Sequence, residues 1–151
     1  MDLSSIARGS VFVWYEYLFE DRSKKDKFII TLNCNTKDSK VNTVKTSHIF
    51  IVLPASQFAK HYYNNADNML DTVILEPGEC RFFEKKTIID LKKAICKEID
   101  NIKAAIIDDR LKYLGLLEDD IIKKIEDEIA EAFTISQEHK DILLCRDSSD
   151  I

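Results

Sequence analysis

The chain has 151 residues, of which 45% are hydrophobic and 32% are charged, and its formal net charge at pH 7 is −5. This composition is typical of one globular domain, which at this length buries about two thirds of its unfolded surface. No run of about eighteen apolar residues is present, and residues 1–10 lack the apolar centre of a secretory signal. We therefore expect a cytoplasmic protein without a transmembrane helix.

The charge is unevenly distributed along the chain. Residues 1–88 carry 12 basic and 11 acidic side chains, whereas residues 89–151 carry 10 basic and 16 acidic ones. A protein that bound nucleic acid with its whole surface would be basic throughout. Any RNA binding by this chain is therefore expected at a local basic patch in its first half.

The cysteines give no sign of a metal site. They stand at positions 34, 80, 96 and 145, with neither a Cys-x-x-Cys spacing nor a nearby histidine. In a reducing cytosol the default is four free thiols, so we expect no metal and no cofactor. Only three glycines and two prolines occur, which argues against long linkers and favours a single domain over residues 1–151.

Strand signals begin in residues 10–19 and 27–33, which flank a charged turn over residues 20–27. Side chains alternate between the two faces of a strand, and on the first strand both faces are apolar apart from Glu16. We expect that strand to be covered on both sides, in a small barrel or in a sheet under a helix. The turn contributes a first candidate surface for phosphate, formed by Arg22, Lys24, Lys25 and Lys27.

Further along, residues 34–44 are rich in turn-forming side chains, and residues 47–53 form a third strand that Pro54 is expected to end. Residues 55–68 read as a polar, aromatic loop of the kind that often carries function. A fourth strand is expected over residues 71–75, and the Pro-Gly pair predicts a turn over residues 76–79. Short β-like pieces follow over residues 81–83 and 86–89.

The hydrophobic period changes to three and four residues after position 90. It predicts an amphipathic helix over residues 91–107, one helical turn over residues 110–114, and a helix from Asp119 whose apolar stripe ends at Phe133. A short third helix is expected over residues 139–144 and a frayed tail over residues 145–151. Strands (residues 9–89) that precede helices (residues 90–144) predict an α+β fold.

Four segments in this order resemble the PemK/MazF-like family of toxin endoribonucleases. The segments are Gly9-Ser10-Val11-Phe12-Val13, Phe19-Glu20-Asp21, Lys24-Lys25-Asp26-Lys27-Phe28-Ile29-Ile30-Thr31-Leu32 and Ile51-Val52-Leu53-Pro54-Ala55-Ser56-Gln57. The resemblance covers about residues 9–107 and implies a small SH3-like antiparallel β-barrel followed by C-terminal helices. In active members an arginine followed by proline begins the second strand, whereas this chain has Lys27-Phe28. A lysine offers phosphate a point charge in place of a bidentate fork.

The resemblance implies metal-independent cleavage of single-stranded RNA by attack of a ribose 2′-hydroxyl on the neighbouring phosphorus. Lys27 would then hold the phosphate and Ser56 would donate its hydroxyl, while His61 is assigned as the acid–base group by its chemistry alone. The residues expected to contact RNA are Arg22, Lys24, Lys25, Gln57, Tyr62 and Tyr63. The family also implies a homodimer, a small antitoxin partner and no membrane.

Structural interpretations stand beside these assignments. The basic turn is first of all a solvated hairpin tip, Tyr62 and Tyr63 more often pack against the sheet, and His61 can be a surface residue. Arg81, with the phenylalanines and lysines of residues 82–86, forms either a basic-aromatic strip or a strand whose rings fill the core, and the strand is favoured. Two other functions stay open: a non-catalytic PemK/MazF-like binding protein, and an assembly module that pairs through its C-terminal helices.

Overall fold

The computed structural model describes residues 6–18, 24–32, 49–58, 62 and 66–145. Within these residues the chain forms strands, three α-helices and two short 3₁₀ helices. The strands are β1 (Ser10–Leu18), β2 (Lys24–Thr31), β3 (Ile49–Gln57), β4 (Thr72–Leu75), β5 (Thr87–Asp90), β6 (Ile95–Glu98) and β7 (Leu111–Leu116). The helices are η3 (Ala66–Met69), η4 (Leu91–Lys93), α1 (Ile99–Ile107), α2 (Asp119–Glu131) and α3 (Gln137–Leu143).

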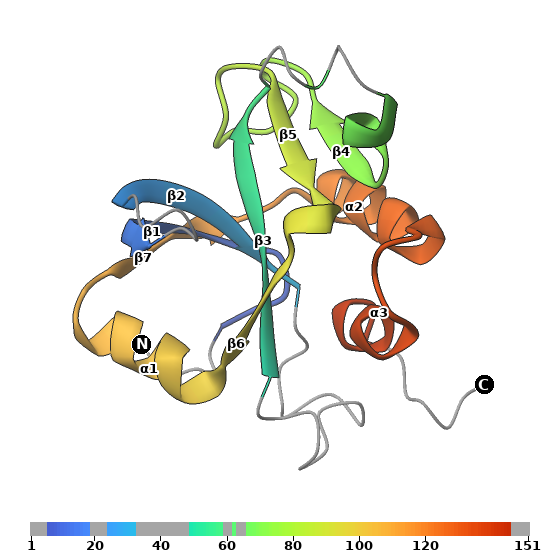
Figure 1. The fold of residues 1–151 in the computed structure, drawn as a ribbon. Coiled ribbons are helices and arrows are strands. Elements are labelled where there is room, and N and C mark those ends of the chain that lie inside the picture. Colours follow the sequence, from blue (N-terminus) through green and yellow to red (C-terminus); the bar gives the residue numbers. More distant parts are fainter. Residues whose placement is uncertain (1–5, 19–23, 33–48, 59–61, 63–65, 146–151) are drawn as a thin grey trace.

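The strands form one antiparallel sheet in the order β4-β5-β3-β2-β1-β7, and β6 pairs with β3 outside this path. The α+β class is therefore confirmed. The described strands β4 and β7 are the two ends of that path, so these strands form an open sheet and not the closed barrel that was expected. The long strand β3 crosses the middle of the molecule and joins its two halves (Figure 1).

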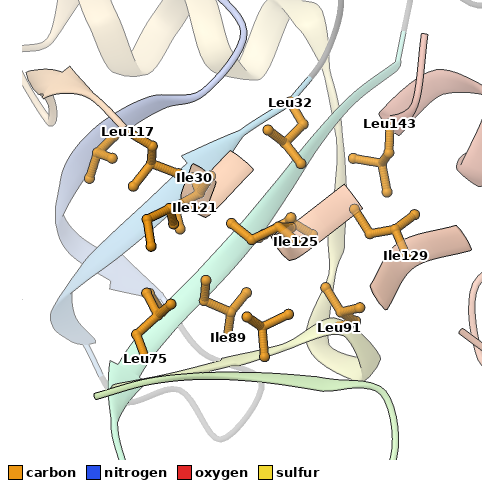
Figure 2. Packing of buried hydrophobic residues seen from close by; sticks show 14 of the residues in the cluster. Ile30, Leu32, Leu75, Ile89, Leu91, Leu117, Ile121, Ile125, Ile129 and Leu143 are labelled. Atoms are coloured by element: carbon orange, nitrogen blue, oxygen red, sulfur yellow. The ribbon is translucent and has the colours of Figure 1, made fainter. Parts of the chain in front are cut away.

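Helices cover both faces of this sheet. Helices α2 and α3 lie on one side of β3 and α1 lies on the other (Figure 1). The larger core lies between the sheet and α2 and α3, and Figure 2 shows Ile121, Ile125 and Ile129 of α2 facing the strand residues. The smaller core lies on the opposite face, where Phe12 and Trp14 of β1 pack with Ile102 of α1. The first strand is thus apolar on both faces because each face packs into a separate core.

The predicted stripe of the second helix is confirmed for Ile121, Ile125 and Ile129, which are buried against the chain's own sheet, and Ile122 is partly buried against the same core. It fails at Phe133, whose side chain is 84% exposed. Helix α2 ends at Glu131, and Ala132 already has extended backbone angles. Phe133 therefore does not continue the helical period. Because the stripe is occupied within the chain, it offers no open face for pairing with another chain.

The prediction of one helix over residues 91–107 is wrong in its first half. Residues 91–93 form η4 and Ile95–Glu98 form β6, which pairs with Ile49–Val52 of β3, and the helix begins only at Ile99. Residues 110–114 are likewise not helical but enter β7, which pairs with β1. In both places pairing with a distant strand decides the backbone conformation, and local periodicity does not report it.

Pro54 does not end the third strand. It lies inside β3 opposite Ile29 of β2, between the segment that pairs with β6 and the segment that pairs with β5. The missing N–H of proline is tolerated where no ladder bond is needed, and β3 changes partner at this point. Strand β2 also begins earlier than expected, at Lys24, so Lys24 and Lys25 belong to a strand and not to the turn.

The turn at residues 76–79 is confirmed by its backbone. The N–H of Glu79 donates to the carbonyl of Glu76 at 3.0 Å, and Gly78 has φ +80°. A proline followed by a residue with positive φ is the pattern of a type II turn. The chain then continues through residues 81–86 without the β-like piece that was expected at 81–83. This irregular segment leads to the candidate site.

Candidate functional site

An open pocket of about 370 Å³ lies where β2, β3 and β5 meet the segment that follows the type II turn. Of the residues predicted to act on RNA, Ser56 and Gln57 belong to its wall, and most of the remaining wall comes from residues 81–87. The lining residues are Phe28, Ala55, Ser56, Gln57, Arg81, Phe82, Phe83, Glu84, Lys85 and Thr87. None of them belongs to α2 or α3, so the C-terminal helices do not close this pocket.

Ser56 and Gln57 reach the pocket because they form the last two positions of β3. The ladder places Ser56 opposite Ile88 and Gln57 opposite Thr87 of β5. Ser56 is half-buried and Gln57 is exposed. As consecutive residues of a strand they point to opposite faces, so the Ser56 hydroxyl and the Gln57 amide, each able to donate and accept, lie on the two sides of the end of β3.

Lys27 lies at the same end of the sheet. Phe28 of β2 is opposite Ala55 of β3, so Lys27 and Ser56 are the next residues of these two antiparallel strands. The period of two places both side chains on the face opposite to Phe28 and Ala55. Lys27 is half-buried, is paired with Trp14 of β1 and is not among the lining residues. The predicted pair is thus brought together on neighbouring strands, on the face of the sheet opposite to Phe28, and Lys27 does not line the pocket.

Arg81 supplies the pocket with a guanidinium group that is held in place. Its Nη2 donates to the carbonyl of Leu116 at 2.8 Å, its backbone N–H donates to Glu118 at 3.2 Å, and its guanidinium lies 4.7 Å above the ring of Phe82. Lys85 lines the same pocket four residues later. The sequence interpretation that favoured a strand here understated these two cations, and the position of Arg81 depends on its contact with the end of β7.

The aromatic residues of the pocket come from two elements. Phe28 of β2 meets Phe83 with ring centroids 5.4 Å apart and an angle of 89° between the ring planes. Glu84 follows directly and is exposed. Sequence reasoning did not select Phe28 or Glu84. The signal that could have indicated Phe28 is an aromatic residue in the position directly after the predicted phosphate-binding lysine.

The remaining predicted site residues do not meet at this pocket within the described part of the chain. Arg22, His61 and Tyr63 lie outside the described residues. Lys24 and Lys25 lie at the start of β2, opposite Leu18 and Tyr17 of β1, and are not among the residues that line the pocket.

Tyr62 is only 2% exposed, because its ring packs 5.6 Å from the ring of Phe58. Its hydroxyl donates to Asp90 at 3.2 Å. Burial raises its pKa to about 12, and the charge and hydrogen bond of Asp90 add to this rise. A buried phenol with a carboxylate partner has no open ring face on which a base could stack, so the role expected for Tyr62 does not fit its position.

The cysteines differ from the expectation of four free thiols. Cys145 is disulfide-bonded, whereas Cys80 and Cys96 are free. Burial raises the pKa of the Cys80 thiol, and it does the same for Cys96, whose sulfur lies 3.6 Å from Nε2 of His139. A raised pKa disfavours the reactive thiolate form. No group of three or more His, Cys, Asp or Glu side chains is placed to hold a metal ion in the described residues.

Comparison with known proteins does not assign the chain to a family. No protein-family model matches the chain, and no curated protein matches it in sequence. Among the described residues, no helix is both long enough and apolar enough to span a membrane.

Proposed function

We propose that the protein is a PemK/MazF-like endoribonuclease that cleaves single-stranded RNA at the pocket beside Ser56. The observation that carries this proposal is that Ser56 and Gln57 at the end of β3 line one open pocket together with two cations, Arg81 and Lys85. The four residues come from regions of the sequence 24 to 29 positions apart. Their convergence is what a site for a ribose-phosphate requires, since phosphate is bound by cations and by hydroxyl and amide donors.

The reaction assigned to this site is attack of a ribose 2′-oxygen on the neighbouring phosphorus. The phosphorus–O5′ bond breaks, and the products are a 2′,3′-cyclic phosphate and a free 5′-hydroxyl. Arg81, Lys85 and Lys27 would stabilise the charge that develops on the phosphoryl oxygens, and Ser56 would donate a hydrogen bond to one of them. Arg81 offers the fork geometry that the family places at the start of the second strand and that Lys27 lacks.

Proton transfer needs two further groups. Glu84 lines the pocket, and a carboxylate can accept the proton of the 2′-hydroxyl. His61, expected to act as acid or base, lies in the segment that leaves the end of β3 and keeps that assignment as a prediction. A homodimer and an antitoxin partner follow from the family resemblance and are likewise predictions.

The proposal is tested by incubating the purified protein with a long single-stranded RNA in EDTA. Discrete fragments are expected, with a rate about 10²–10³-fold lower for Ser56→Ala, because one lost donor to a developing charge has about that effect. Arg81→Gln should slow cleavage similarly. Arg110→Gln is the matched control, since Arg110 is an exposed arginine paired with Asp108 and lies outside the pocket. Equal rates for all three variants would contradict the assignment.

A second function, RNA binding without cleavage, is favoured by one observation. Lys27 stands in place of the family's arginine and is not among the residues that line the pocket. In that case the RNA would stay intact in EDTA and still bind. With three phosphate contacts, the slope of log affinity against log salt is expected near −2 for a single strand, at about −0.7 per contact.

A further inference from the structure

The pocket has an aromatic side whose role is not explained by phosphate binding. Phe28, Phe82 and Phe83 all line it, and Phe28 is 37% exposed. Phe83 meets the Phe28 ring at 89°, and a perpendicular contact occupies at most one face of that ring. A large apolar ring is thus left open inside a pocket that is otherwise edged by polar and charged groups.

The aromatic side is held in position by contacts within the protein. Gly115 of β7 lies against it with φ +151°, and a Cβ atom at this position would stand 2.9 Å from Cζ of Phe82. Arg81 covers Phe82 and is itself fixed by the carbonyl of Leu116. The aromatic side is therefore already formed without a bound molecule. This lowers the free-energy cost of ordering side chains when a molecule binds.

The polar groups at the edge suit a flat heterocycle that carries a phosphate. Gln57 is exposed and can hydrogen-bond to the edge of a nucleobase, while Arg81 and Lys85 supply positive charge beside it. The volume of about 370 Å³ lies at the small end of the usual range for ligand pockets, about 300–1,000 Å³. This is room for one nucleotide and not for a longer stretch of chain.

We infer that the pocket binds one unpaired nucleobase, which stacks on Phe28 while Arg81 and Lys85 hold the adjacent phosphate. The inference rests on the proposed function, because it takes single-stranded RNA as the ligand. It adds that one position of the strand is recognised through its base, whereas the neighbouring positions are held through their phosphates. Stacking is available to every base because each has a π face, and the hydrogen-bonding groups at the edge can then select among them.

The test uses fluorescein-labelled single-stranded heptanucleotides that lack every 2′-hydroxyl and so cannot be cleaved. A single abasic site is moved through the seven positions, and binding is measured by fluorescence anisotropy at low salt. For the wild type, one position should weaken binding about 5- to 150-fold when its base is removed, which is the range for loss of one aromatic–base stack. The other positions should change binding much less.

Phe28→Leu keeps an apolar side chain and removes the aromatic face. It should weaken binding of the intact oligonucleotide by a similar factor and abolish the penalty of the sensitive abasic position. Phe133→Leu is the matched control, because Phe133 is an exposed phenylalanine at the end of α2 and outside the pocket. It should bind as the wild type does and keep the abasic penalty.

The possible results test the base-binding pocket and the proposed nuclease separately. Equal affinity at all seven abasic positions, or an unchanged abasic penalty in Phe28→Leu, would overturn the base-binding pocket and leave the proposed cleavage untouched. A position-dependent penalty in a protein that leaves RNA intact in EDTA would support the base-binding pocket and reject the nuclease. Absence of binding to any of these oligonucleotides at low salt would overturn the base-binding pocket, and cleavage of RNA in EDTA would then decide the proposed function separately.

Discussion

Asp71 joins the corner between α2 and α3 to the start of β4, and its replacement by asparagine is a direct test of this architecture. The carboxylate is 4% exposed and accepts three hydrogen bonds, from the Phe133 N–H at 3.1 Å, the Thr134 N–H at 2.7 Å and the Thr134 hydroxyl at 2.6 Å. Asp71 has φ +54°. Asparagine tolerates this conformation and has nearly the same shape, so the substitution changes the charge and little else.

The expected cost follows from the geometry. If the amide oxygen of asparagine takes the place of Oδ2, it still accepts the two hydrogen bonds from Thr134. The NH₂ group then takes the place of Oδ1 and faces the Phe133 N–H. One hydrogen bond to a charged acceptor is lost and two donors oppose each other, which predicts a destabilisation of about 1.5–3 kcal/mol at pH 7.

The cost should depend on pH. Burial alone would raise the pKa of Asp71, but the hydrogen bonds from Thr134 and Phe133 and the charge of Lys92 together hold it below its usual value. The stabilisation by this carboxylate is therefore complete above the pKa of the unfolded chain, about 3.9, and is lost as the pH falls through the lower pKa of the folded state. Wild type and Asp71→Asn should converge in stability at low pH.

Urea denaturation at neutral pH and at several acidic pH values measures both effects, provided unfolding is two-state. Asp127→Asn is the matched control, because Asp127 forms an exposed i,i+4 pair with Lys123 that is worth about 0.3–0.5 kcal/mol. A loss below about 0.5 kcal/mol for Asp71→Asn at pH 7, or a loss that does not shrink in acid, would refute the reasoning.

Three further predictions concern the core, the pocket wall and the buried phenol. Ile125→Ala removes a fully buried side chain from α2 and should cost about 2–5 kcal/mol in urea denaturation, as usual for such truncations. Gly115→Ala should destabilise the protein more than Gly78→Ala, because both glycines have positive φ but only at Gly115 would the new Cβ collide with Phe82; equal losses would contradict the contact. The phenol of Tyr62, with its pKa of about 12, should stay protonated in the folded protein where an unfolded tyrosine, with a pKa near 10, ionises. Stability should fall as the pH rises from about 10, and a spectrophotometric titration of Tyr62→Phe should lack the last phenolate step.

Local sequence patterns predicted the elements whose conformation is decided by their own residues. The helix from Asp119 has a regular apolar stripe, and the short helix near the C-terminus begins after Ser136, whose hydroxyl accepts from the N–H of His139. The Pro77-Gly78 turn follows from the backbone preferences of two residues. In these places the local preference and the observed structure agree.

Strands that depend on a distant partner were missed. Ile95 stands four residues before Ile99, and this spacing also fits a helix. Residues 95–98 nevertheless form β6, because they pair with β3. Leu111–Leu116 becomes β7 because it pairs with β1, nearly a hundred residues earlier. The same change of partner along β3 allows Pro54 to remain inside the strand. None of these pairings leaves a local signal in the sequence.

The candidate site was predictable only in part. Ser56, Gln57 and Lys27 were selected from their positions along the chain, and the structure places all three at one end of the sheet. Arg81 and Lys85 were given the less favoured role, because their segment follows a turn in place of forming a strand and the guanidinium of Arg81 is directed by its contact with β7. Phe28 was not selected, since an aromatic residue in a strand usually belongs to the core and only the pocket distinguishes it.

The measurement that tests the central claim most directly is mass spectrometry of RNA after incubation with the wild-type protein and with Ser56→Ala in EDTA. The account predicts wild-type fragments that end in a 2′,3′-cyclic phosphate and begin with a 5′-hydroxyl, and about 10²–10³-fold fewer of them from the variant. Intact RNA at high protein concentration would contradict cleavage at this pocket, as would fragments with other ends or equal yields from both proteins.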